Sequence, residues 1–249
     1  MISTDKTVLL TRWHVCISTI AILVFAFLLN RGYGDAGFLM RQGNYYFNGG
    51  AYDLEKAEAA FQRAVRIEPG ILWGHYQLAR IYFVKGDSVK AIEEINKELK
   101  ANPENLRALY VRGLIYGFGK NFASAEEDFR RFTRWAPKEW AGHNDLAWIL
   151  AKEEKYAEAE SAIKKAFREI PGGDKNPWLW NSLGVAELNL KKNKEARLSF
   201  EKAKQLLGVM TLAEWSRAYP GNDPAAAEGG WRAFLGAVEE NLQRSYNLK

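Results

Sequence analysis

Apolar and polar side chains follow one another along residues 36–210 with the spacing of amphipathic helices. Within 106–139 the apolar or small residues form two runs whose members are three, four or seven positions apart: Leu109, Gly113 and Tyr116, then Ala125, Phe129 and Phe132. This spacing places them on one face of a helix. A break at Gly119-Lys120 divides the run, so the pattern predicts two helices joined by a short turn.

The same two-helix pattern repeats every 34 residues. Four of the seven prolines lie on this period, at Pro69, Pro103, Pro137 and Pro171. A proline has no amide hydrogen and restricts the residue before it, so each one predicts the end of the second helix of a pair. A fixed period of this length indicates a protein built from stacked helix pairs.

The small and aromatic positions within each period resemble those of the tetratricopeptide repeat family, whose units pair a helix A with a helix B. In the second unit the matching residues are Leu78, Ala79, Tyr82, Ala91, Ile95 and Pro103. The resemblance implies an all-α helix-turn-helix solenoid of about five repeats, at 36–69, 72–105, 106–139, 140–173 and 177–210. The fifth unit lacks the terminal proline and begins three residues late, after an insertion at 172–175.

Residues 211–249 follow the repeats and are predicted to cap them. Thr211 and Glu214 have the spacing of a capping box, and a helical stripe of apolar residues runs from Trp231 to Tyr246. An open solenoid exposes the apolar flank of its last repeat, so we expect capping helices here. The alternative is that the last helix docks a partner.

Residues 13–30 form a long apolar stretch, preceded by a short tail at 1–12. From Trp13 to Leu29 the sequence contains no Asp, Glu, Lys or Arg. A helix of this length spans roughly 26 Å, close to the ~30 Å hydrocarbon core of a bilayer. The sequence therefore predicts one N-terminal transmembrane helix.

Basic residues on the two sides of this stretch set the expected orientation. Lys6 and Arg12 precede it, whereas Arg31 and Arg41 follow it. The small bias favours a single-pass inner membrane protein with a cytoplasmic N-terminus and a periplasmic repeat domain. The alternatives are a cytoplasmic repeat domain and a cleaved signal peptide.

The composition of the chain narrows the function classes. The 249 residues are 47% hydrophobic and 26% charged, as is typical of a folded protein, and the net charge of +5 comes from well-mixed side chains. Such a charge does not predict nucleic-acid binding. The single cysteine excludes an internal disulfide, and the three histidines form no metal-ligand motif. Because no catalytic motif is found, we expect no enzyme activity, no catalytic residue, no metal, no cofactor and no small-molecule substrate.

The family resemblance implies that helix A of each repeat lines a concave face. Aromatic side chains and arginines are frequent on this face, and such residues dominate binding hot spots. The candidate partner-binding residues are Trp73, Tyr76, Arg80, Phe83, Arg107, Tyr110, Leu114, Phe118, Asn144, Trp148, Trp178 and Asn181. We predict that this groove takes an apolar or amphipathic peptide segment. The alternative is that superhelical curvature or the C-terminal helix buries these rings.

Some members of the family grip a C-terminal carboxylate with a clamp of Lys, Asn, Asn, Lys and Arg. Asn44 and Arg107 match two of those five positions, but Met40, Gln77 and Val111 occupy the other three. A carboxylate needs convergent charged donors, so we do not expect a clamp of this type.

Together these features predict a non-catalytic, membrane-tethered adaptor or assembly factor for protein–protein interaction. Its partner is expected to be a protein or peptide, in particular another membrane or envelope protein. The alternative is a permanent structural subunit of a larger membrane complex, with the transmembrane helix packed through small and polar residues such as Ser18 and Thr19.

Overall fold

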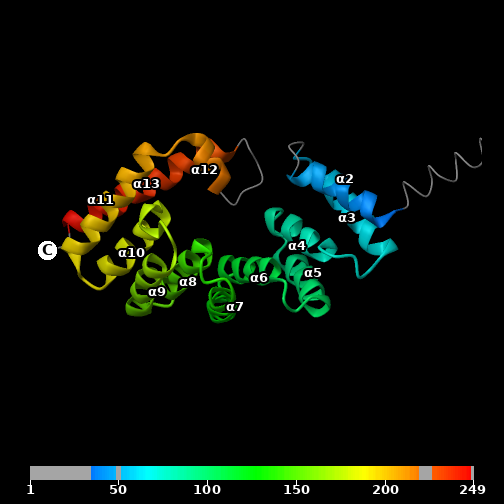
Figure 1. Ribbon diagram of the computed structural model, residues 1–249, viewed down its shortest axis with the longest axis horizontal. Helices are drawn as coiled ribbons and strands as arrows, with labels where there is room; N and C mark the ends of the chain where they lie inside the picture. The colour runs from blue at the N-terminus through cyan, green and yellow to red at the C-terminus, as the bar shows by residue number, and fades with distance from the viewer. Residues whose placement is uncertain (1–34, 49–51, 219–225, 248–249) are drawn as a thin grey trace, which may run out of the picture. The chain divides into compact units, whose positions relative to one another are not determined.

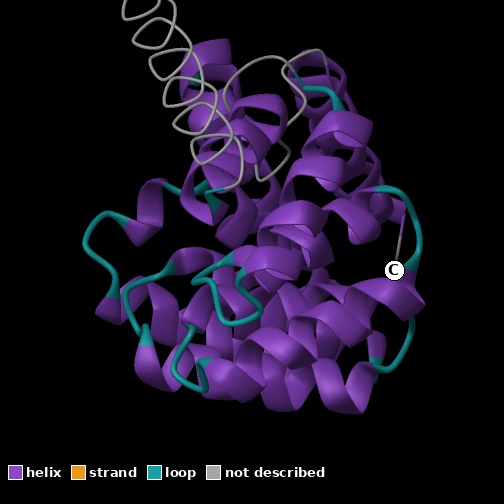
Figure 2. Cartoon of the chain, turned by 90° about the vertical axis from the view of Figure 1, so that its right-hand side faces the viewer, coloured by secondary structure: helices purple, strands orange, loops and turns teal. Residues whose placement is uncertain are grey.

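The computed structural model describes residues 35–48, 52–218 and 226–247. Within these ranges the regular structure consists of twelve α-helices, α2 to α13, and one short 3-10 turn, η1 (Gly173–Lys175), and contains no strand (Figures 1 and 2). None of the helices in these ranges has the length and apolar character needed to cross a bilayer. The transmembrane helix predicted at 13–30 lies outside the described residues.

Ten of the helices form five consecutive pairs. These are α2 (Ala36–Asn48) with α3 (Leu54–Ile67), α4 (Gly74–Val84) with α5 (Ser88–Ala101), α6 (Leu106–Phe118) with α7 (Phe122–Trp135), α8 (Trp140–Lys152) with α9 (Tyr156–Glu169), and α10 (Pro177–Asn189) with α11 (Asn193–Val209). Two further helices, α12 (Leu212–Ala218) and α13 (Ala226–Asn247), follow. The chain divides into an N-terminal unit that ends at Gly74 and a C-terminal unit that begins at His75.

Proline ends four of the second helices, as the sequence predicts. The residues that cap α3, α5, α7 and α9 each stand directly before one of the periodic prolines; they are Glu68, Asn102, Ala136 and Ile170. The beginnings of three of these helices, α3, α5 and α7, are set by polar side chains. Asp53, Asp87 and Asn121 accept hydrogen bonds from backbone amides three residues further on, which satisfies donors that a helix start leaves unpaired.

The turns inside the last four pairs share one backbone feature. Gly86, Lys120, Glu154 and Lys191 adopt left-handed conformations, with φ of 80°, 63°, 59° and 62°. This conformation reverses the chain between the two helices of a pair. Glycine adopts this conformation without a steric penalty, whereas in the other three residues the Cβ atom makes it less favourable.

Glycines in the first helices make room for phenylalanines of the second helices. A Cβ atom added at Gly43, Gly113 or Gly184 would lie 2.5, 2.9 and 2.6 Å from the ring of Phe61, Phe129 or Phe200, respectively. Those distances are shorter than a van der Waals contact, so no larger residue fits without moving the ring. The alternation of small and aromatic residues in the sequence therefore reports direct helix–helix contact.

In the C-terminal unit, α8 and α10 each pack on both helices of the pair before them. Helix α8 contacts α6 and α7, and α10 contacts α8 and α9, as Figure 1 shows along the green and yellow part of the ribbon. A buried carboxylate on α5 connects this helix to α4 and to the residue that caps α6. Glu98 of α5 is 1% exposed and accepts hydrogen bonds from the backbone amide of Tyr76 and from the side chains of Asn102 and Asn105.

Helices α12 and α13 pack on the last pair. Thr211 and Glu214 form the capping box that starts α12, with reciprocal backbone-to-side-chain bonds of 2.8 and 3.2 Å. Trp215 and Val238 are buried with Leu207 of α11, and α13 contacts α10, α11 and α12. The apolar side of the last pair is thus covered by the chain's own C-terminal segment.

Candidate functional site

Three aromatic side chains from successive first helices form a continuous row. Phe83 near the end of α4 contacts Phe118 at the end of α6, with ring centroids 5.7 Å apart, and Phe118 contacts Trp148 of α8 at 5.1 Å. Phe118 is 65% exposed, whereas Phe83 and Trp148 are partly buried. We call these three residues the ring row. All three were predicted as partner-binding residues, and the structure brings them together.

A glycine positions the tryptophan of the ring row. A Cβ atom added at Gly117 of α6 would lie 2.8 Å from the indole of Trp148. The missing side chain therefore leaves the space that the indole fills. The sequence alone does not single out Gly117, since a glycine within a helix gives no signal of a ring that lies 31 positions further along the chain.

A hydrogen-bond network lies beside the ring row and joins three first helices. The Tyr110 hydroxyl of α6 donates to Asp145 of α8 at 2.5 Å, and the Asn144 amide donates to the other oxygen of Asp145 at 3.0 Å. The Ser182 hydroxyl of α10 donates to Asn144 at 2.8 Å. The Tyr110 ring also packs on Phe132, with centroids 5.1 Å apart. Tyr110 and Asn144, both predicted to bind a partner, are thus committed to contacts within the protein.

Burial dominates the acid–base behaviour of this network. It raises the pKa of Asp145 from 3.8 to about 6, although the hydrogen bonds from Tyr110 and Asn144 act in the opposite direction. Burial, and then the neighbouring Asp145, raise the pKa of the Tyr110 hydroxyl as well. The ion pairs found among the described residues do not include Asp145. Its carboxyl therefore changes charge near pH 6.

Stability is expected to depend on pH through Asp145. The unfolded chain releases this proton near pH 3.8 and the folded chain near 6, so the free energy of unfolding should fall as the pH rises from about 4 to 7. The difference corresponds to about 3 kcal/mol. Asp145→Asn should remove this contribution and make the protein more stable than the parent at pH 8 but not at pH 4. Urea unfolding at a series of pH values measures it, and parallel curves for the two proteins would contradict it.

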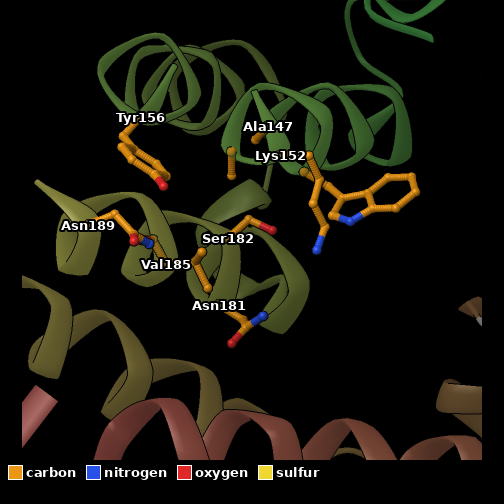
Figure 3. A pocket seen from close by; sticks show the side chains of 9 residues that line it. Ala147, Lys152, Tyr156, Asn181, Ser182, Val185 and Asn189 are labelled. Atoms are coloured by element: carbon orange, nitrogen blue, oxygen red, sulfur yellow. The ribbon is translucent and has the colours of Figure 1, made fainter. Parts of the chain in front are cut away.

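A pocket of about 270 Å³ opens next to the ring row, between α8 and α10 (Figure 3). The lining residues are Ala147, Trp148, Ala151, Lys152, Tyr156, Asn181, Ser182, Val185 and Asn189. In Figure 3 the Lys152 side chain extends from α8 toward the α10 side of the pocket, where Ser182 and Asn181 lie. Lys152 is exposed, and within the described ranges it forms no ion pair or hydrogen bond.

Most of this lining was not among the predicted partner-binding residues. Val84, Phe118, Lys152 and Asn189 occupy one repeat position once the insertion at 172–175 is counted. The alignment of the repeats thus indicated that Lys152 and Asn189 lie at the same position of the repeat as Phe118. It could not show that the position opens into a pocket, because that depends on the side chains of the neighbouring helix.

Trp178 of α10 is covered by the C-terminal helices. Its ring stacks on Trp215 of α12 at 4.9 Å and on Phe234 of α13 at 5.6 Å, and on Trp140 at 5.0 Å. The Trp178 ring therefore packs within the protein, and the partner-binding role predicted for it stays a prediction. The alternative stated from the sequence, burial of these rings by the C-terminal helix, applies to Trp178 and not to the ring row.

The remaining predicted residues have varied surroundings. Trp73 precedes α4 in the N-terminal unit and has a left-handed φ of 70°. Tyr76 is buried, and the Arg80 guanidinium lies 5.5 Å from the centre of its ring. Arg107 is exposed at the start of α6, and Leu114 packs against the core formed by α7, α8, α9 and α10. Asn181 accepts a hydrogen bond from Asn241 of α13 at 3.4 Å.

The histidines and acidic residues of the described ranges form no cluster of three or more that could hold a metal ion. His143 is buried, and its Nε2 lies 2.9 Å from the carbonyl oxygen of Pro137. The pKa of this imidazole is lowered, chiefly by burial. This environment is that of a packed, neutral side chain.

Comparison with known proteins agrees with the geometry. Residues 116–174 match the family profile described as Tetratricopeptide repeat. Tetratricopeptide repeat protein 14 of Mus musculus is 30% identical over 119 residues, or 44% of this chain and 16% of that protein. Peptidyl-prolyl cis-trans isomerase PASTICCINO1 of Arabidopsis thaliana is 30% identical over 108 residues, or 38% of this chain and 17% of that protein. The chain thus spans about one sixth of these relatives' lengths.

Solved structures share the fold at low sequence identity. The MamA protein aligns with a TM-score of 0.60 at 17% identity, over 70% of this chain and 92% of its own. YrrB, described as a TPR protein with an unusual peptide-binding site, aligns with a TM-score of 0.59 at 20% identity, over 78% and 97%. PilF of Pseudomonas aeruginosa aligns at 0.60 and 18% identity, over 86% and 93%. The described residues therefore share the all-α tetratricopeptide-repeat fold, and residues 116–174 match the tetratricopeptide repeat family.

Proposed function

We propose that the chain is a non-catalytic adaptor that holds a peptide segment of a partner protein against the ring row. The observation that carries this proposal is the exposure of Phe118, 65% of which faces solvent between two partly buried rings. The helix pairs do not need this ring for their packing, since the phenylalanines buried against the glycines fill that role. A contiguous aromatic surface of this kind is typical of a protein-binding site.

The tetratricopeptide fold supports a role as an interaction scaffold. YrrB has this fold and is described with a peptide-binding site, which in that protein is called unusual. For this chain, the row crosses α4, α6 and α8, so an extended segment that follows it would contact one helix after another. Repeat proteins use their stacked elements as extended binding surfaces in this way.

The proposal includes a membrane tether at residues 13–30, with the repeats on the periplasmic side of an inner membrane. The support is the uncharged apolar stretch from Trp13 to Leu29 and the basic residues before it. A tether would restrict the adaptor to the membrane surface and raise its effective concentration for membrane and envelope proteins. Native sizing after mild detergent extraction would separate a transient adaptor, which elutes alone, from a permanent subunit, which elutes with its partners.

The ring row is tested by the double substitution Phe118→Ala and Trp148→Ala. We expect partner capture in intact membranes to fall at least tenfold, since aromatic hot spots contribute about 2 kcal/mol or more each. Leu198→Ala on α11 is the control for the substitution, and a photoreactive amino acid at position 89 of α5 is the control for crosslinking. Both positions are exposed and lie on second helices. Tyr110 is a poor choice for this test because its removal would take away one of the two side-chain hydrogen bonds that Asp145 accepts.

Capture is measured by crosslinking from a photoreactive amino acid at position 118, followed by mass spectrometry. A partner that crosslinks equally well from positions 118 and 89 would contradict the proposal. So would capture that persists unchanged in the double variant while circular dichroism shows the parent's helix content.

A further inference from the structure

We infer that the bound segment carries an acidic side chain next to a bulky apolar one, and that Lys152 binds the acid while the pocket beside Trp148 takes the apolar group. The inference rests on the proposed function, because it names the chemistry of the peptide that the ring row would hold. It concerns the pocket between α8 and α10. Of the predicted partner-binding residues, only Trp148 and Asn181 line this pocket.

Lys152 differs from Lys155 and Lys192, two paired lysines of the neighbouring helices and turns. Lys155 binds Glu126 and Glu153 at 2.7 and 3.1 Å, and Lys192 binds Glu160 at 2.7 Å. Lys152 has no such partner within the described ranges, although it also stands among acidic residues in the sequence. A lysine in the last turn of a helix complements the helix dipole. That role does not require the side chain to extend over the pocket, as it does in Figure 3.

The pocket offers hydrogen-bond donors and no carboxylate. The Tyr156 hydroxyl has no partner among the described residues, and Asn181 uses only its oxygen, toward Asn241. The Ser182 hydroxyl already donates to Asn144. Lys152, Tyr156 and the Asn181 amide therefore leave three donors around the pocket. Donors that include one cation fit an acceptor with a single negative charge, such as a side-chain carboxylate.

The walls of the pocket fit an apolar side chain. Ala147, Trp148, Ala151 and Val185 provide apolar surface between the polar groups. The volume of about 270 Å³ is below the roughly 300–1,000 Å³ of small-molecule sites, so one or two side chains fill it better than a separate ligand would. A phosphorylated peptide fits less well, because phosphate is recognised by clusters of arginine and this pocket contains none.

Asp145 lies on the same face of α8 as Lys152, two helical turns away. Asp145, Trp148 and Lys152 occupy positions i, i+3 and i+7 of α8, which places the acid and the base about 10 Å apart along the helix. That distance is about one Debye length at physiological salt, and Asp145 already accepts hydrogen bonds from Tyr110 and Asn144. Asp145 therefore neither neutralises Lys152 nor repels an acid bound there.

The test is a selection from a random peptide library displayed on phage, with the full chain held in lipid nanodiscs as bait. Peptides selected by the parent should share a bulky apolar residue with Asp or Glu at a fixed offset. A synthetic peptide of that consensus should bind Lys152→Glu at least tenfold more weakly than the parent, and Lys152→Glu should itself select Lys or Arg at the same offset. Lys100→Glu, an exposed lysine in the last turn of α5, is the matched control and should bind like the parent.

The outcomes separate the two proposals. If the selected peptides lose binding to the Phe118→Ala and Trp148→Ala variant but carry no acid and bind Lys152→Glu as well as the parent, the inference about Lys152 is wrong and the adaptor function stands. If no peptide is enriched, or if binding ignores the ring row, both proposals are wrong. Thermal unfolding followed by circular dichroism establishes that each variant is folded before it is used.

Discussion

Replacing Trp215 with alanine should lower the free energy of unfolding by about 3–5 kcal/mol, the range for truncating a large buried aromatic side chain. Trp215 is 1% exposed, and its ring stacks on Trp178 at 4.9 Å and on Phe234 at 5.9 Å. Its removal leaves a cavity that the rigid helix pair α10–α11 cannot close. Because Trp215 joins α12 and α13 to the repeats, we also expect the C-terminal helices to detach first.

Chemical denaturation followed by circular dichroism and by tryptophan fluorescence would measure this effect. Leu212→Ala on the same helix is the matched control, since Leu212 is 49% exposed and its loss should cost well under 1 kcal/mol. A loss below about 1 kcal/mol for Trp215→Ala would show that the C-terminal helices contribute little to stability, contrary to the packing described above.

Replacing Asp128 with alanine is the second large change, with an expected loss of about 3 kcal/mol. The Arg112 guanidinium of α6 donates to both carboxylate oxygens of Asp128 in α7, at 2.8 and 2.7 Å. Asp128 is 3% exposed, so the truncation leaves a half-buried cation without its acceptor. We place the loss at the lower end of the usual range because the Arg112 side chain remains 23% exposed and keeps a hydrogen bond to Asn96.

A double variant distinguishes the cost of leaving Arg112 unpaired from the loss of the ion pair itself. Arg112→Met with Asp128→Leu replaces the pair by apolar side chains of similar size, and its stability should be close to that of the parent. Urea unfolding of the parent, both single variants and the double variant gives the coupling free energy directly. If the double variant were as unstable as Asp128→Ala alone, the ion pair itself would be essential and the explanation by an unpaired cation would be wrong.

The sequence was sufficient to predict the parts of the fold that depend on local chemistry. Each proline stops a helix by removing a donor and restricting its neighbour, and each small residue opposite a phenylalanine follows from close contact within one helix pair, as with Gly113 and Phe129. Both effects involve residues of one helix pair, so the sequence pattern that causes them recurs in each repeat. The helix predicted at 13–30 stays a prediction.

The roles of individual surface residues could not be predicted in the same way, because they depend on segments that are distant in the sequence. Trp178 and Trp148 are both aromatic residues on first helices, yet α12 and α13 cover only the former. Tyr110 faces the predicted groove, but its hydroxyl binds Asp145, 35 residues away. The lack of a partner for Lys152 likewise becomes visible only when the acids around the neighbouring Lys155 have been placed.

The stacked rings at the C-terminal end also determine how the array of repeats terminates. When the last helix pair of an array exposes its apolar side, a second copy of the chain can stack on it. Copies joined in that way form filaments. Here Trp178, Trp215 and Phe234 cover that side with the chain's own residues. Growth by end-to-end stacking is thereby blocked at this end, so the number of stacked helix pairs stays fixed.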